Sequence, residues 1–462
     1  MSKKIFFGLG MLAMQMFPAA LGIFMVVLIQ DFGFDPLMWG LIFFLPRVVD
    51  AVTDPVMGFI SDNTKSRWGR RRQYIFVGAI IMGISFIAMW QIYPENGLSF
   101  NFWYFLLLSV VFYLGLTIFS VPYVALGYEM STDFHERTRI MAVSQWISQW
   151  AWVIVPWFWI IIYDDSWFSS PESGTRTLAI YVSVFCTLLA LVPALFIKGK
   201  STLNDDTLVN INFKAIKENL STLIIGFKDA ANNKPFVRLC VATFFIFNSF
   251  QTIAAFSFFI IVYYLFQGDA NAAGVWPTLH GSVGALLTTF LVIPIVTKMS
   301  ERLGKKKTFV ISQAISILGY ILFWFLFIPG KPYMFLFALP LFSFGIGGLF
   351  TLMMSMTADT CDLDELNNGL PRKEATFGAL YWWMVKFGTA LAGLFSGIIM
   401  STVGFDASLP EQTESAMTGL RIFYTVLPVI GTCIAIYVMK NYEINEASAN
   451  EVSNILAKRN NK

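Results

Sequence analysis

The chain has 462 residues, of which 56% are hydrophobic, 17% are aromatic and only 13% are charged, with a formal net charge of +3. Soluble chains carry roughly 25% charged residues, and two or three soluble domains of this total length would need far more polar surface. The composition excludes an ordinary soluble protein and predicts a polytopic membrane protein.

A membrane helix needs roughly 20 mainly apolar residues. Twelve such runs are predicted in chain order: 5–29, 37–61, 73–93, 101–130, 140–163, 177–197, 237–266, 275–298, 307–328, 333–360, 375–402 and 419–440. The first run is too long for the apolar region of a signal peptide, so we expect a retained membrane helix.

A long polar break separates the sixth and seventh runs. It predicts a six-helix half at 1–198, a cytoplasmic linker at 199–235, a second six-helix half at 236–440 and a cytoplasmic tail at 441–462. Lysine and arginine gather in the break and in the connections after the second, fourth, eighth and tenth runs. Such connections face the cytoplasm, so we expect both termini on that side of a cell inner membrane.

The two halves contain a weak repeat. Residues 58–72 read GFISDNTKSRWGRRR, and residues 294–307 read PIVTKMSERLGKKK. Each segment follows the second run of its half and forms a short basic loop. Two six-helix halves with this loop are typical of the all-α major facilitator fold, in which the substrate binds at the midplane between the halves.

The second run carries three charged residues, Arg47, Asp50 and Asp54, at a spacing that places them on one helix face. Charges inside a membrane usually face a bundle interior or an aqueous cavity. Two carboxylates one turn apart repel each other unless a cation or proton lies between them. We therefore expect a coupling-ion site at Asp50 and Asp54, with Arg47 as a structural partner. The alternative is a structural Arg47–Asp50 ion pair, with Asp54 capping the helix end.

Lys386 is a further charge, in the eleventh run, with no acid within one turn of it. We expect it to couple the ion site to the substrate. Charged residues also gather at the cytoplasmic ends of the fourth and tenth runs, where we expect ion pairs that stabilise one conformation. These gating candidates are Glu129, Arg137, Arg139, Asp359, Asp362 and Arg372.

The motif from Asp50 to Arg70, DxxxDPxxGxxxDxTxSxxGR, resembles the signature of the glycoside-pentoside-hexuronide:cation symporters. PYxALxxE at 122–129, ADxxDxxE at 358–365 and Lys386 with Gly388 agree with it, so the similarity covers essentially the whole chain. The resemblance implies a major facilitator fold and sugar uptake coupled to Na+ or H+. It also implies that Thr117 and Thr53 belong to the cation site with the two aspartates.

The sugar site departs from melibiose permease, which typifies that family. Gln15, Ser120 and Gln145 stand where that protein has two aspartates and an arginine, and Val124 replaces a tryptophan. We expect Gln15, Ser120, Gln145 and Lys386 to meet the substrate, with Trp382 and Phe350 as the nearby aromatic residues. Because the site carboxylates are replaced, an anionic sugar such as a uronate or a sulfonated sugar is one possible substrate.

The sequence thus predicts a monomeric secondary symporter for a sugar or glycoside, surrounded by membrane lipid, with no cofactor, no resident metal and no nucleic-acid partner. One alternative keeps the fold but transports a lysolipid or another amphiphile. A second alternative is a membrane enzyme or sensor. The chain contains no HExxH or GxSxG motif and only two histidines, which argues against an enzyme.

Overall fold

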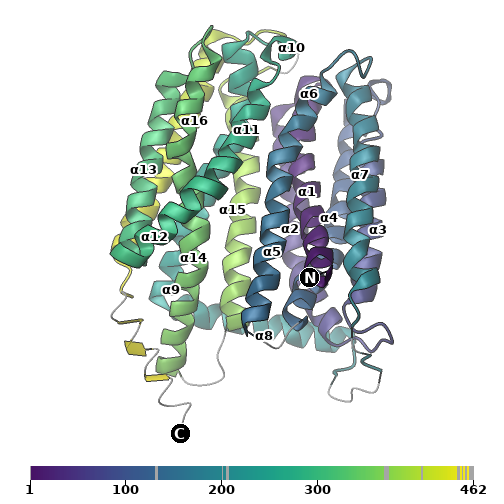
Figure 1. Cartoon of the computed structure of the whole chain (residues 1–462). Coiled ribbons are helices and arrows are strands. Elements are labelled where there is room, and N and C mark those ends of the chain that lie inside the picture. Colours follow the sequence, from purple (N-terminus) through teal and green to yellow (C-terminus); the bar gives the residue numbers. More distant parts are fainter. Residues whose placement is uncertain are drawn as a thin grey trace. The chain divides into compact units, whose positions relative to one another are not determined.

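The computed structural model describes residues 2–130, 134–199, 201–203, 208–368, 374–406, 409–444, 448–449, 451–452 and 455–456. Within these residues every regular element is helical. Twelve helical segments are long and apolar enough to cross a membrane, as the sequence predicts. Figure 1 shows the long helices lying side by side within each half of the chain.

The described chain divides into two compact units. Unit 1 comprises residues 1–220 with the short segments 269–282 and 406–410, and unit 2 comprises the remainder. The elements of the first half are α1 Ser2–Gln30, α2 Pro36–Asp62, α3 Arg72–Met89, η1 Pro94–Asn96, α4 Leu98–Glu129, α5 Phe134–Ile154, η2 Val155–Trp157, α6 Phe158–Ile162 and α7 Pro171–Phe196.

The linker helix α8, Phe213–Asn232, precedes the second half. The elements that follow are α9 Lys234–Phe259, η3 Ile260–Leu265, α10 Ala270–Ala273, α11 Trp276–Leu286, η4 Leu287–Val292, α12 Ile293–Leu303, α13 Lys305–Leu326, η5 Pro332–Phe337, α14 Leu339–Asn368, α15 Glu374–Thr402 and α16 Glu414–Lys440. The eighth candidate span, Ala270–Leu303, is thus built from α10, α11, η4 and α12.

The helices of the two halves pair in the same way. In unit 1, α1 packs against α5 and α7, α3 packs against α4 and α7, and α2 packs against α4. In unit 2, α9 packs against α15 and α16, α13 packs against α14 and α16, and α12 packs against α14. Numbered by span, these are the same five pairings, so the weak sequence repeat at 58–72 and 294–307 corresponds to a structural repeat.

Glycines allow equivalent helix pairs to approach closely in each unit. A Cβ atom on Gly78 of α3 would lie 2.4 Å from the backbone nitrogen of Phe119 in α4. A Cβ atom on Gly319 of α13 would lie 2.4 Å from the backbone nitrogen of Phe342 in α14. Small residues permit such backbone contact between membrane helices. Large buried aromatic side chains, including Phe86, fill the neighbouring core.

Three irregular stretches interrupt the expected spans. Pro156 lies in the 3₁₀ turn η2, which ends α5 because proline cannot donate the helical hydrogen bond. Residues 260–265 and 287–292 form π-helical turns within the seventh and eighth spans. Such turns widen a helix locally and are frequent at functional sites.

Candidate cation and substrate site

The charged turn of α2 lies in the second membrane span. Asp50 and Asp54 are one helical turn apart, and Asp50 is only 4% exposed. Pro55 follows directly, so the carbonyl oxygen of Ala51 lacks its usual helical donor. The local sequence thus concentrates carboxylate and carbonyl oxygens within one turn of a membrane helix.

Thr117 of α4 lies against this turn. Its hydroxyl oxygen is 2.5 Å from Oδ1 of Asp50 and 3.1 Å from Oδ1 of Asp54. The Thr53 hydroxyl is 3.4 Å from that of Thr117 and also donates to the carbonyl oxygen of Val49 at 3.0 Å. The structure therefore brings together all four residues expected at the cation site, Asp50, Asp54, Thr53 and Thr117.

The number of hydroxyl hydrogens in this cluster limits how many carboxylate oxygens can accept a hydrogen bond at once. The Thr117 hydroxyl has one hydrogen, so it can donate to only one of the two carboxylates at a time. The second carboxylate oxygen then lies near an oxygen lone pair in a buried site, which is unfavourable unless a proton or cation intervenes. Oxygen ligands of this kind suit a hard cation. Among the described residues, no three His, Cys, Asp or Glu side chains form a metal-binding group.

Arg47 lies one turn before Asp50 on α2. Its guanidinium carbon is 4.9 Å from the ring centroid of Phe43 and 5.6 Å from that of Tyr113. These cation–π contacts hold the arginine against α4, because an aromatic face attracts a cation at this distance. Arg47 therefore packs at the α2–α4 interface that also contains the carboxylates.

Three of the expected substrate residues lie in unit 1. Gln15 of α1 and Ser120 of α4 are partly buried, and Gln145 of α5 is exposed. The Ser148 hydroxyl donates to the backbone carbonyl oxygen of Gln145 at 2.8 Å and lies 3.4 Å from its side-chain Oε1. The opposite side of α5 packs on α1, where Gly8 closely approaches Ile147.

The other three substrate residues lie in unit 2. Trp382 and Lys386 are one turn apart on α15, and Phe350 lies on α14. Trp382 is 46% exposed and Phe350 is 45% exposed, although each makes an edge-to-face contact with one neighbouring ring. That these residues share one cavity with Gln15, Ser120 and Gln145 stays a prediction.

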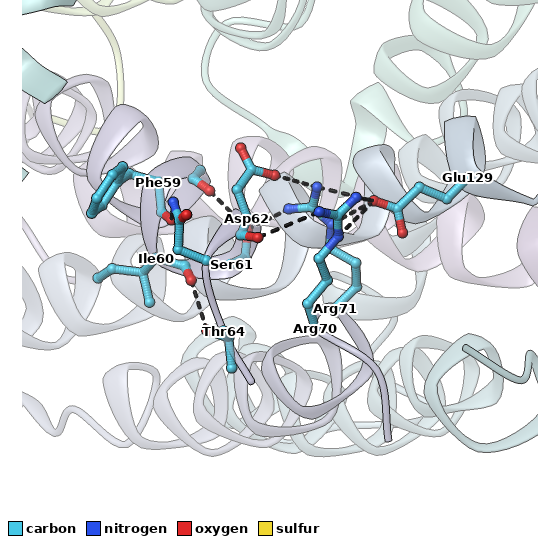
Figure 2. Close-up of polar contacts among 10 residues, drawn as sticks. Phe59, Ile60, Ser61, Asp62, Thr64, Arg70, Arg71 and Glu129 are labelled. Atoms are coloured by element: carbon cyan, nitrogen blue, oxygen red, sulfur yellow. Dashed lines mark hydrogen bonds and ion pairs between the residues drawn. The ribbon is translucent and has the colours of Figure 1, made fainter. Parts of the chain in front are cut away.

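The expected gating residue Glu129 ends α4 and contacts the basic loop after α2, as Figure 2 shows. Its Oε1 accepts hydrogen bonds from Arg70 at 2.7 and 3.1 Å, and from Arg71 at 3.1 Å through two nitrogens. Arg71 also pairs with Asp62 and donates to the Ser61 hydroxyl at 2.7 Å. The Arg71 side chain is only 7% exposed, whereas those of Glu129 and Asp62 are 35% and 54% exposed, so the network is buried at Arg71 and open to water at its acids.

Unit 2 repeats this arrangement in a simpler form. Lys305, the first residue of α13 in the basic segment after α12, donates to both carboxylate oxygens of Asp359 at 2.6 and 2.9 Å. Asp359 lies on α14, the tenth span, just as Glu129 ends the fourth. In both units an acid near the end of the fourth span of its half binds the basic loop.

The chain matches a family model described as MFS/sugar transport protein over residues 6–446. It belongs to this family. The glucuronide carrier protein homolog of Escherichia coli (strain K12) is 25% identical over 425 residues, which cover 89% of this chain and 86% of the relative. The sodium-dependent lysophosphatidylcholine symporter 1 of Xenopus tropicalis is 22% identical over 475 residues, which cover 96% and 87% of the two chains.

A solved nucleoside transporter, NupG, superposes with a TM-score of 0.66 at 14% identity, covering 96% of this chain and all of the other. At this identity the likeness shows the fold alone. Together with the family model, it confirms the major facilitator fold and a multi-pass membrane transporter of the sugar-symporter kind.

The basic partners of the gating acids Glu129 and Asp359 could not be predicted from the sequence. The sequence identifies Arg70, Arg71 and Lys305 only as basic residues that follow the second and eighth spans, and the structure shows that Glu129 and Asp359 are their acidic partners. Of the other gating candidates, Arg139 is exposed and Asp362 is half-buried. The Arg137 side chain and Arg372 lie outside the described residues.

A half-buried acid lies at the opposite end of unit 1 from the basic loop. Asp31, which follows α1, accepts a hydrogen bond from the Tyr163 hydroxyl at the end of α6. Burial raises the pKa of Asp31 from 3.8 to about 7; the Tyr163 hydrogen bond acts against this shift, and the charge of Glu172 adds to it. This carboxyl therefore titrates near neutral pH.

Proposed function

We propose that the protein is a secondary symporter that imports a sugar or glycoside together with Na+ or H+ by alternating access. The observation that carries this proposal is the convergence of Asp50, Asp54 and Thr117 on one buried point. The family relationship supports it. We also propose that the protein functions as a monomer in the cell inner membrane, with both termini and the basic loops in the cytoplasm.

The cluster provides a physical reason for coupling. Two carboxylates of like charge lie one helical turn apart in a partly buried site, where a bound cation or an added proton reduces the repulsion between them. A bound cation removes that repulsion and lowers the free energy of any conformation in which the site is closed. Coupling then means that the ion and the substrate each favour the same conformation. Lys386 would link the two, because its ammonium can interact with a carboxylate or with a substrate oxygen.

The loop contacts support the proposal of a second role, in gating. Glu129 with Arg70 and Arg71, and Asp359 with Lys305, each connect the basic loop of a unit to one helix. We propose that these ion pairs stabilise one conformation of the transport cycle, with Arg137, Arg139, Asp362 and Arg372 as further gating candidates.

Glucuronides are the first substrates to test. Gln15, Ser120 and Gln145 supply amide and hydroxyl groups, and Lys386 supplies the one cation of the expected site. These groups can bind sugar hydroxyls and a uronate carboxylate without a repelling acid. The glucuronide carrier homolog of Escherichia coli supports the same class of substrate.

A lysolipid is the second candidate substrate, and one observation favours it. An apolar crevice opens between α9, α15 and α16 of unit 2, and Phe244, Phe245, Phe395 and Ile430 line it together with Asn248. A lateral crevice of this kind could accept an acyl chain, and a named lysophosphatidylcholine symporter is among the relatives.

The test is uptake into proteoliposomes from a panel of glucuronides, neutral glycosides and lysophosphatidylcholine, each with and without an inward Na+ or H+ gradient. We expect one sugar class to accumulate and one gradient to stimulate it at least tenfold. Uptake of lysophosphatidylcholine alone would replace the sugar proposal with the lipid one. Uptake that ignores both gradients would refute cation coupling.

A further inference from the structure

The segment after α7 lies against the basic loop of unit 1. Arg72, at the start of α3, donates to the carbonyl oxygens of Ala194 at 2.6 Å and Leu195 at 3.1 Å. Further along, the Thr202 backbone donates to the Ser66 carbonyl at 3.0 Å, and its hydroxyl accepts from the Ser66 amide at 3.1 Å. Two segments more than 120 residues apart in sequence are thereby fixed together.

Gly199 also lies close to the loop. A Cβ atom there would lie 3.0 Å from the carbonyl oxygen of Trp68 and 3.5 Å from Cδ of Arg72. The neighbouring residue, Lys198, is therefore held next to the Trp68–Arg72 stretch of the loop. The Arg72 guanidinium lies 5.5 Å from the Trp68 ring centroid, which adds a cation–π contact.

The residues at this contact are basic, aromatic and exposed. Arg67 and Lys198 are both exposed, and Trp68 is 49% exposed. The acids of the same loop region have other partners, because Asp62 pairs with Arg71 and Glu129 accepts from Arg70 and Arg71. Among the described residues no acid forms an ion pair with Arg67 or Lys198.

The contact also lies at the boundary of the membrane. Arg72 begins the third candidate span, and Phe196 ends the sixth. Leu195 and Phe196, directly before Lys198, are 48% and 59% exposed, so an apolar surface adjoins the basic one. Tryptophan is enriched at the interface between membrane and water. The excess of lysine and arginine in cytoplasmic loops explains a basic loop by itself. It does not explain why hydrogen bonds hold the loop after α2 against the segment after α7, with the exposed Trp68 beside them.

We propose that Arg67, Trp68, Arg72 and Lys198 form a binding surface for the headgroup of an anionic phospholipid in the cytoplasmic leaflet. The phosphodiester meets the two exposed cations, the Trp68 ring lies at the level of the headgroup, and the acyl chains lie along Leu195 and Phe196. Basic residues near an anionic membrane surface strengthen lipid binding roughly fivefold each. The proposal rests on the proposed orientation but not on the transported substrate or the coupling ion.

The experiment measures thermal unfolding of the purified full-length protein during titration with phosphatidylglycerol or phosphatidylcholine. We expect phosphatidylglycerol alone to raise the melting temperature. Arg67→Gln/Lys198→Gln should shift its half-saturating concentration upward about 30-fold. The matched control is Lys217→Gln/Lys228→Gln on α8, which removes two exposed charges of the same sign from the linker.

An equal shift in the control pair would reduce the effect to general surface charge and overturn the specific site. An equal rise in melting temperature with inorganic phosphate would show that a soluble anion, not a lipid, is the occupant. Both pairs must unfold at the wild-type temperature in phosphatidylcholine, which separates lost binding from lost folding. A trial with Trp68→Ala tests the aromatic contribution and should also weaken phosphatidylglycerol binding.

Discussion

Thr117 provides the sharpest test of the proposed ion site, because valine has almost its shape but no hydroxyl. In the structure this hydroxyl lies 2.5 Å from Asp50 and 3.1 Å from Asp54. Hydrogen bonds to charged groups contribute about 1.5–3 kcal/mol. Thr117→Val should therefore change the cation concentration for half-maximal uptake by about 10- to 100-fold, upward if the hydroxyl oxygen is a ligand of Na+ and downward if the hydroxyl only donates to a carboxylate that takes up H+, whereas Thr117→Ser should restore most of the wild-type affinity.

The assay is substrate uptake into proteoliposomes over a range of cation concentrations at saturating substrate. The control is Thr297→Val, since the hydroxyl of that exposed threonine donates only to the carbonyl of Ile293 in its own helix, at 2.8 Å. If Thr117→Val changes the cation requirement less than threefold, or no more than the control does, Thr117 is not part of the ion site.

Three further changes test other parts of the molecule. Glu129→Gln should slow transport about fivefold without changing cation affinity, because a partly exposed ion-pair network contributes about 1 kcal/mol to one conformation; an unchanged rate would remove its gating role. Lys386→Ala should abolish or uncouple uptake, and full cation-dependent transport in this variant would contradict the coupling role. Because the pKa of Asp31 is raised to about 7, its ionisation costs stability as pH rises from about 4 to 7. Asp31→Asn should thus raise the melting temperature at pH 8 but not at pH 4, a gain of at most about 4 kcal/mol. Asp164→Asn is the control of opposite sign, since Ser166 lowers the pKa of that exposed carboxyl, and a pH-independent effect of Asp31→Asn would refute the shift.

The sequence was sufficient for the membrane spans because each requires a long apolar run, and the twelve runs agree with the twelve candidate helices. It did not predict helix α8, which lies in the polar break between the halves. Apolar residues recur at helical spacing in that segment, which includes Phe213 and Ile224. The segment as a whole is not apolar enough to be recognised as a membrane span. The π-helical turns at 260–265 and 287–292 were also missed, because no proline or glycine marks those residues.

The ion site could be predicted in part from local spacing. Asp50 and Asp54 share a helix face by periodicity alone, and the structure agrees. Thr117 is 63 residues from Asp54 in sequence, so its place beside the carboxylates came from the family resemblance rather than from spacing. The partners of Glu129 were harder to identify, because several nearby arginines compete and only packing of the loop after α2 selects Arg70 and Arg71.

The central claim is that Asp50 and Asp54 carry the ion whose gradient drives uptake, and accumulation against a concentration gradient tests it most directly. Proteoliposomes containing wild-type protein, Asp54→Asn or the exposed control Glu95→Gln are given equal substrate and the same cation gradient. Wild-type protein and Glu95→Gln should concentrate the substrate, whereas Asp54→Asn should only equilibrate it. Substrate concentrated by Asp54→Asn to the wild-type level would contradict the account.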